Sequence, residues 1–144
     1  YIALRVALAA GCEEVLIPEK EIDLKQMYAE IIEGNEKGKV SWIIIVAEGK
    51  AKAADIADSI TAKTGLETRI AVLGHIQRGG VPTAFDRILA SRLGYYAVEL
   101  FNKGETGKCV CLKAGEFSTI SYEQALQPRE IRVEGDYKLI KILT

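Results

Sequence analysis

The feature that most constrains this chain is the succession of a strand, a glycine-rich loop and a helix start within residues 69–87. The apolar run at 70–73 is typical of a strand buried on both faces of a parallel sheet. The only histidine, His75, and Arg78 follow this run, and a proline and a threonine at 82–83 begin a long amphipathic helix. Ligands bind at the carboxyl ends of such strands, arginine forks match phosphate oxygens, and glycines admit backbone N–H groups. The stretch therefore predicts a phosphate-binding loop.

Two further apolar runs precede this stretch. Residues 15–17 read as a short buried strand that ends at Pro18, and residues 42–47 are the most hydrophobic segment and read as a central strand. Helical patterns separate the three runs, which is the order of repeated strand–helix–strand units. The sequence therefore predicts an α/β fold, a Rossmann-like three-layer sandwich with a mostly parallel sheet.

Cap signals mark the ends of the predicted helices. The first ten residues read as a helix that stops at Gly11. A second helix is expected to begin after Asp23, in a capping box with Gln26, and to close at Gly34. A third helix is expected to stop at Gly65.

The carboxyl-terminal part is less regular. The helix that begins at 82–83 is predicted to end near Gly104, and residues 108–112 read as a strand. Residues 118–122 are compatible with a further strand or with the start of a short helix around 123–126.

Composition excludes several classes of function. Hydrophobic residues make up 49% and charged residues 27%, and the net charge of −1 gives no basic field for nucleic acid. No apolar run approaches the roughly 18 residues of a membrane span, and no signal peptide is recognised. The odd number of cysteines, Cys12, Cys109 and Cys111, favours reduced thiols in a cytoplasmic protein. Because Tyr1 lies inside a helical pattern and is not a methionine, a fragment or processed product is expected.

Several short motifs specify individual residues rather than a composition. They are Arg69, Gly74-His75, Gln77-Arg78-Gly79-Gly80 and Asp86-Arg87, together with Ala10-Gly11-Cys12-Glu13, Pro18-Glu19, Lys37-Gly38-Lys39, Val46-Ala47-Glu48 and Leu89-Ala90-Ser91-Arg92-Leu93-Gly94. In this order they resemble the carboxyl-terminal half of the bacterial-type 6-phosphofructokinase family over roughly residues 1–110. The resemblance implies a fructose 6-phosphate-binding α/β domain at 1–76. It also implies that the long helix and tail at 77–144 pack on a nucleotide domain that is absent from this chain.

The resemblance also implies a substrate site. Glu48, His75 and Arg78 correspond to residues that bind fructose 6-phosphate within one subunit, and Arg69 to a residue that crosses to a neighbouring subunit. That arrangement implies a homo-oligomer, a tetramer in the family. Arg78 also corresponds to a position beside the transferred phosphoryl group, where its charge would stabilise the transition state. The alternative for both arginines is simple solvation at the surface.

An effector site is implied by a second set of positions. Gly11 and Glu13 resemble positions that engage the Mg²⁺ of bound ADP, and Lys37 and Lys39 resemble lysines that meet the effector phosphates. A lysine–glycine–lysine turn is also common on surfaces, so a solvated turn is the alternative.

The family's nucleotide-phosphate motif and its catalytic aspartate loop do not occur in this sequence. The chain is therefore expected to lack a general base and to be inactive alone, with Mg²⁺ and the phosphoryl donor, ATP or pyrophosphate, bound mainly elsewhere. Two other classes stay open. One is a non-catalytic sugar-phosphate-binding or regulatory module, and the other is a nucleic-acid binder built on residues 75–80, against which the neutral charge counts.

Overall fold

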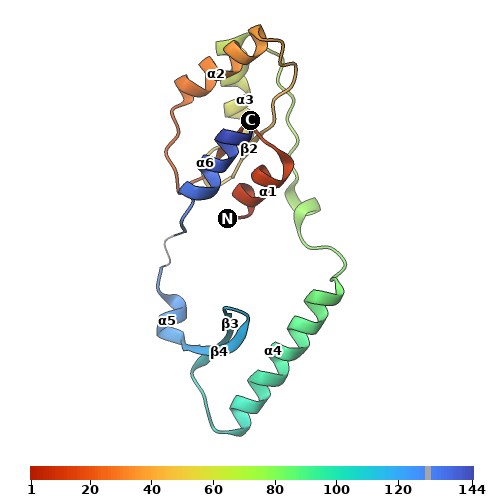
Figure 1. The fold of residues 1–144 in the computed structure, drawn as a ribbon, viewed down its shortest axis with the longest axis vertical. Helices are drawn as coiled ribbons and strands as arrows, with labels where there is room; N and C mark the ends of the chain where they lie inside the picture. Colours follow the sequence, from red (N-terminus) through yellow and green to blue (C-terminus); the bar gives the residue numbers. More distant parts are fainter. Residues whose placement is uncertain (129–130) are drawn as a thin grey trace. The chain divides into compact units, whose positions relative to one another are not determined.

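The computed structural model describes residues 1–128 and 131–144, and the chain forms two compact units (Figure 1). Unit 1 comprises Tyr1–Val72 and Glu130–Thr144, and unit 2 comprises Leu73–Arg129. The carboxyl-terminal helix thus packs with the first unit, whereas the sequence interpretation grouped residues 77–144 together. The helix returns to unit 1 because its apolar side chains complete a core there.

Unit 1 is built from helices around a parallel pair of strands. Its elements are α1 (Ile2–Ala10), β1 (Glu14–Leu16), α2 (Leu24–Glu36), β2 (Ile44–Val46), α3 (Ala53–Thr64) and α6 (Glu134–Leu143). The strands pair in parallel with Glu14 opposite Ile44 and Leu16 opposite Val46. Because α2 connects them, β1–α2–β2 is one strand–helix–strand unit, and the predicted α/β class with a parallel sheet is confirmed.

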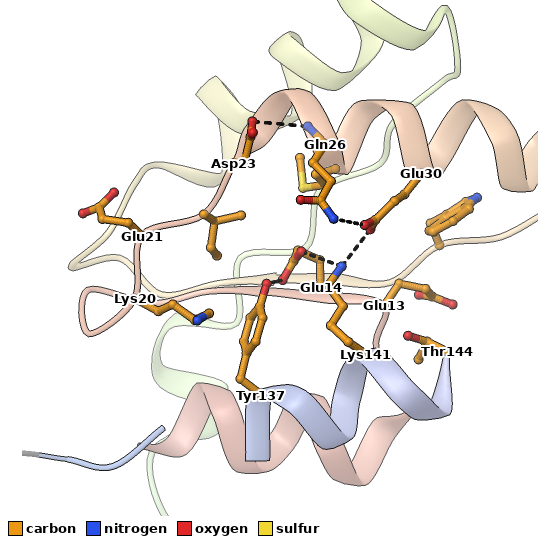
Figure 2. Close-up of a pocket in the computed structure, with 13 residues that line it drawn as sticks. Glu13, Glu14, Lys20, Glu21, Asp23, Gln26, Glu30, Tyr137, Lys141 and Thr144 are labelled. Carbon is orange, nitrogen blue, oxygen red and sulfur yellow. Dashed lines mark hydrogen bonds and ion pairs between the residues drawn. The ribbon is translucent and has the colours of Figure 1, made fainter. Parts of the chain in front are cut away.

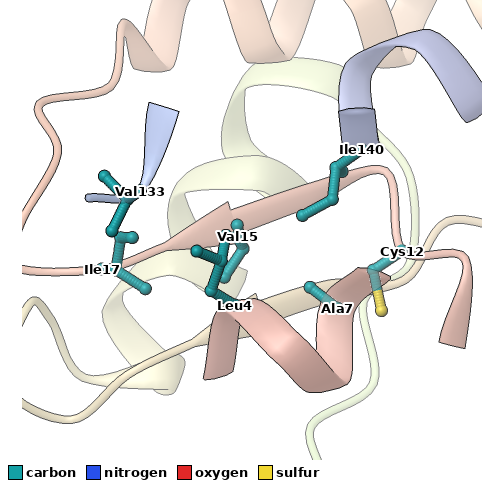
Figure 3. Close-up of a cluster of buried hydrophobic side chains, with 7 residues drawn as sticks. All are labelled: Leu4, Ala7, Cys12, Val15, Ile17, Val133 and Ile140. Carbon is teal, nitrogen blue, oxygen red and sulfur yellow. The ribbon is translucent and has the colours of Figure 1, made fainter. Parts of the chain in front are cut away.

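Two hydrophobic clusters fill unit 1. The first joins the sheet to α1 and α6, as Figure 3 shows; its buried members are Leu4, Ala7, Cys12, Val15, Ile17, Val133 and Ile140. The second joins the sheet to α2 and α3, with buried members Leu16, Met27, Ile31, Ile56 and Ile60. Val15 and Leu16 belong to different clusters because successive strand side chains point to opposite faces.

The predicted strand at residues 70–73 does not form. These residues have no regular secondary structure, and Ile70 and Val72 are 47% and 71% exposed. A parallel strand needs a hydrogen-bonded neighbour, and within the described residues the parallel sheet consists of β1 and β2 alone. The prediction of three strands was therefore wrong for this chain, although the apolar pattern that suggested it is real.

The helix ends follow the cap signals with one exception. Gly11 and Gly65 adopt left-handed φ values of 65° and 72°, and the Asp23 side chain accepts hydrogen bonds from two backbone N–H groups of the first turn. The exception is Gly34, where α2 continues to Glu36.

Gly34 is required for packing rather than for a turn. A Cβ at this position would lie 2.4 Å from the Cζ2 atom of Trp42, so only glycine lets the indole ring rest against the helix. The capping box predicted after Asp23 is half formed: the Asp23 carboxylate accepts the Gln26 N–H, while the Gln26 side-chain amide donates to Glu30.

Unit 2 contains a short 3₁₀ helix, a long helix, a hairpin and a final short helix. The elements are η1 (Gly74–Gln77), α4 (Ala84–Asn102), β3 (Lys108–Lys113), β4 (Glu116–Ser121) and α5 (Tyr122–Leu126). Both alternatives for the segment after residue 117 are realised in succession, as strand and then helix. Thr83 and Asp86 form a reciprocal capping box at the start of α4.

No described residue of unit 2 is fully buried, and α4 exposes Phe85 and Phe101 by 70% and 72%. Among the helices that the structure describes, none combines the length and apolar character needed to cross a bilayer.

Candidate functional site

The substrate candidates are divided between the two units. In unit 1, Glu48 lies in an exposed turn that follows β2, and Arg69 lies in the irregular segment after α3. Among the residues that the structure describes, Arg69 pairs with Glu67 alone, at 3.4 Å, and both side chains are at least 80% exposed. Such a pair holds the guanidinium weakly, so it is available to an anion. His75 and Arg78 belong to unit 2.

The loop around η1 presents His75 and Arg78 to solvent. Gly74 and Gly79 bracket it with φ values of 50° and 65°, a conformation that glycine adopts without strain. The N–H of Arg78 donates to the carbonyl of His75 at 2.9 Å, which fixes their backbone separation. An exposed imidazole and guanidinium on one glycine-bounded turn suit a phosphate group.

The structure brings two of the effector candidates together. Lys39 Nζ lies 2.9 Å from Glu13 Oε1 and 4.5 Å from the centre of the Trp42 ring. The other carboxylate oxygen of Glu13 accepts the Ile43 N–H at 2.6 Å. Burial alone would raise the pKa of Glu13, but the hydrogen bonds from Lys39 and Ile43 outweigh it, and the pKa is lowered. The result is an ionised, internally paired carboxylate and ammonium.

The other two effector candidates lie apart from this pair. Lys37 is exposed and forms an ion pair with Glu33 one helical turn earlier, and Gly11 is the exposed residue that ends α1. Within residues 1–128 and 131–144, no group of three or more metal-binding side chains comes together. A single carboxylate still fits Mg²⁺, which is commonly bound by one or two carboxylates with water and substrate phosphates. Glu13 would have to exchange Lys39 for the ion.

A buried polar network that sequence reasoning missed lies next to Glu13. Glu14 is only 3% exposed, and its carboxylate accepts the Tyr137 hydroxyl at 2.7 Å and pairs with Lys141 at 2.9 Å. Lys141 also pairs with Glu30 at 2.8 Å, as Figure 2 shows, so α6 is linked to both β1 and α2. We call Glu14, Glu30, Tyr137 and Lys141 the α6 network.

The α6 network changes the ionisation of its members. Burial and the hydrogen bond to Glu14 raise the pKa of Tyr137. Burial lowers the pKa of Lys141, but its hydrogen bonds to Glu30 and Glu14 outweigh this and leave the pKa raised. Burial likewise opposes the lowered pKa of Glu30, which its hydrogen bonds from Lys141 and Gln26 produce. At neutral pH the lysine is therefore charged and the tyrosine protonated.

The network and Glu13 line one cavity of about 610 Å³ in unit 1 (Figure 2). The sequence contained one signal for it, a carboxylate at Glu14 directly before the apolar residues 15–17. Its partners on α6 lie more than a hundred positions along the chain, at a separation of 123 residues for Tyr137. No periodicity or spacing rule could have connected them.

Comparison with known proteins gives the class and then the family. Parallel strands covered by helices on both faces place unit 1 among α/β proteins. A profile of the family described as Phosphofructokinase matches residues 1–101. The chain belongs to the phosphofructokinase family, which confirms the resemblance drawn from its motifs.

Two curated relatives show how much of the family's length this chain represents. The ATP-dependent 6-phosphofructokinase of Bacillus pumilus is 52% identical over 115 residues, which are 80% of this chain and 36% of that protein. The ATP-dependent 6-phosphofructokinase of Bacillus subtilis is 44% identical over 143 residues, which are 99% of this chain and 45% of that protein. The chain therefore spans less than half the length of these relatives.

Solved structures agree on the fold. The phosphofructokinase of Pichia pastoris matches with a TM-score of 0.70 and 26% identity, over 85% of this chain and 14% of that one. The phosphofructokinase of Saccharomyces cerevisiae matches with a TM-score of 0.71 and 27% identity, over 98% of this chain and 19% of that one.

Proposed function

We propose that this chain is the sugar-phosphate-binding part of a 6-phosphofructokinase. The whole enzyme would transfer a phosphoryl group to fructose 6-phosphate, giving fructose 1,6-bisphosphate in glycolysis, in the cytoplasm. The Bacillus relatives are named ATP-dependent, which favours ATP over pyrophosphate as the donor. The observation that carries the proposal is the glycine-bounded turn that exposes His75 and Arg78 together, within the residues matched to the family.

Each substrate candidate has a role that its chemistry permits. Arg78 and His75 would bind the 6-phosphate, because a guanidinium and an imidazole both donate hydrogen bonds to phosphate oxygens. Glu48 would accept hydrogen bonds from sugar hydroxyls. Arg69, whose ion pair with Glu67 is exposed, would reach the sugar phosphate of a neighbouring subunit in a tetramer. Positive charge from Arg78 would also stabilise the transferring phosphoryl group.

The chain alone would not catalyse the transfer. We assign none of the substrate candidates the role of general base toward the sugar hydroxyl, and the chain spans 45% or less of the compared Bacillus enzymes. We assign that base, and most contacts to Mg²⁺ and ATP, to the part of those enzymes that this chain does not match.

Glu13 and Lys39 would form part of an effector site for ADP. Mg²⁺ would bind the Glu13 carboxylate, and Gly11 would contribute a backbone group to the site. Lys39, released from Glu13, would then bind a phosphate together with Lys37. The 2.9 Å ion pair supports this role because it places a carboxylate and an ammonium group side by side.

A chimeric enzyme tests the proposal. The matching segment of the Bacillus subtilis enzyme is replaced by this chain, and phosphorylation of fructose 6-phosphate is measured with Mg²⁺ and ATP. The chimera is expected to be active, and Arg78→Ala is expected to lower kcat by about 10²–10³-fold, the usual loss of one transition-state donor. Arg92→Ala, an exposed arginine on α4, serves as the matched control and should change little.

Two results would overturn the assignment. A folded chimera without turnover would contradict the catalytic proposal, and retained binding of fructose 6-phosphate would then indicate a non-catalytic sugar-phosphate-binding module. Equal activity of Arg78→Ala and Arg92→Ala would remove Arg78 from the site.

A further inference from the structure

We propose that α6 positions the Glu13–Lys39 pair, and that Lys141 and Tyr137 are the positioning residues that do so through Glu14. The inference rests on the proposed effector function, because it assigns to the carboxyl-terminal helix the control of affinity at that site. The ligand class is a nucleoside diphosphate with its Mg²⁺.

The first step is the anchoring of Glu14. It is the only charged side chain that is buried among the residues described by the structure. One of its oxygens accepts the Tyr137 hydroxyl at 2.7 Å and the Val15 N–H at 2.9 Å, and the other pairs with Lys141 at 2.9 Å, so its one ionic partner and one of its two hydrogen-bond donors come from α6. A carboxylate so far from water depends on these partners, so the conformation of the strand at Glu14 depends on α6 being docked.

The second step is the effect of Glu14 on Glu13, the residue before it in the chain. Glu13 immediately precedes Glu14, and its N–H donates to the Ile43 carbonyl at 3.0 Å while its Oε2 accepts the Ile43 N–H at 2.6 Å. Rotation or displacement of the backbone at Glu14 therefore changes both hydrogen bonds. Because Lys39 is held by the other oxygen of Glu13, it would move with them.

The third step is the cavity that the two groups share. Tyr137 and Lys141 of α6 line it together with Glu13 and Trp42. Figure 2 shows Tyr137, Lys141 and Glu13 around it. Lys141 pairs both with Glu14 on β1 and with Glu30 on α2. This single side chain of α6 therefore holds the strand and the helix that follows it. Undocking of α6 would open the cavity directly beside Glu13.

The test measures hydrogen exchange at single amides of the full chain. Lys141→Met is expected to accelerate exchange of the Ile43 N–H roughly tenfold, because the hydrogen bond to Glu13 would open more often. Lys138→Met is the matched control, since Lys138 is exposed on the same helix and has no ion pair among the described residues. Lys141→Arg, which keeps the charge, should restore most of the protection.

Lys141→Met could destabilise the whole of unit 1, and the Ile60 amide of α3 would then also lose protection from exchange. A second, milder variant keeps the test decisive in that case. Tyr137→Phe removes only the hydroxyl that donates to Glu14, and it must still accelerate exchange at Ile43. Unchanged exchange at Ile43 in both variants, or equal acceleration in Lys138→Met, would overturn the inference.

Titration with ADP and Mg²⁺, followed by fluorescence of Trp42, separates this inference from the effector proposal. Wild-type chain should respond, Glu13→Gln should abolish the response, and Lys141→Met should weaken affinity about tenfold, one decade of the dissociation constant. No response from the wild type would contradict the effector proposal while leaving the exchange result as the measure of positioning. A wild-type response with equal affinity in Lys141→Met would contradict the positioning of the site by α6.

Discussion

The α6 network makes the sharpest prediction about stability, through Lys141→Met. At about 3 Å and an effective dielectric constant of about 20, each ion pair of Lys141 is worth roughly 5 kcal/mol before desolvation is subtracted. Removing the lysine leaves the carboxylate of Glu14, which is 3% exposed, without its counter-ion. Breaking a buried pair typically costs about 3–5 kcal/mol. Because the Lys141 side chain is 30% exposed, we expect about 3 kcal/mol, near the lower end.

The double variant Glu14→Leu with Lys141→Leu provides the internal control. Replacing a buried pair by apolar side chains is often neutral or stabilising, so the double variant should lie within about 1 kcal/mol of wild type. Urea unfolding followed by Trp42 fluorescence measures both, provided that the denaturant slope is unchanged. A loss below about 1 kcal/mol for Lys141→Met, or a double variant less stable than the single one, would refute the reasoning.

Three further predictions concern packing, capping and acid. Gly34→Ala should destabilise unit 1 by about 1–3 kcal/mol in urea, because its Cβ would overlap Trp42, whereas Gly94→Ala in α4 meets nothing within 4 Å and should stabilise by about 0.5 kcal/mol. Thr83→Ala should cost unit 2 about 1 kcal/mol and reduce its helical circular dichroism, and Thr83→Ser should not. The pKa of Glu30 is lowered from 4.5, so its stabilisation is present above that pH and is lost as the pH falls through the folded value. Acid titration of Glu30→Gln should therefore show a shallower loss of stability than wild type, and parallel curves would contradict the assignment.

Local signals predicted the elements that depend on a few neighbouring residues. The glycine stop at Gly11, the cap at Asp23 and the capped start of α4 at Thr83 all follow from backbone groups that the nearest side chains satisfy. Gly34 was misread because the reason for its glycine is the ring of Trp42 rather than a turn. Sequence alone shows that position 34 is a glycine, but it does not show whether a turn or close packing requires it.

The strand expected at 70–73 failed for a related reason. Its apolar pattern describes what the segment could bury, while a strand also requires a partner for its backbone groups. Among the described residues the parallel sheet consists of β1 and β2, residues 70–73 are not paired with it, and Val72 stays 71% exposed. The pattern correctly identifies an apolar segment, but it does not show whether the backbone of that segment pairs with another strand.

The two sets of polar residues differ in what the chain itself supplies, and this explains why only one of them was proposed from the sequence. His75, Arg78 and Arg69 are exposed, and within residues 1–128 and 131–144 the one ion pair among them joins Arg69 to Glu67, so folding of the described chain gives no reason for their identity. Their motif points to a ligand outside the chain. Glu14 and Lys141 satisfy one another within the fold, belong to no motif, and could be found only from coordinates. An exposed residue that a motif singles out is therefore the stronger candidate for ligand binding. A buried ion pair that belongs to no motif is the stronger candidate for holding other residues in position.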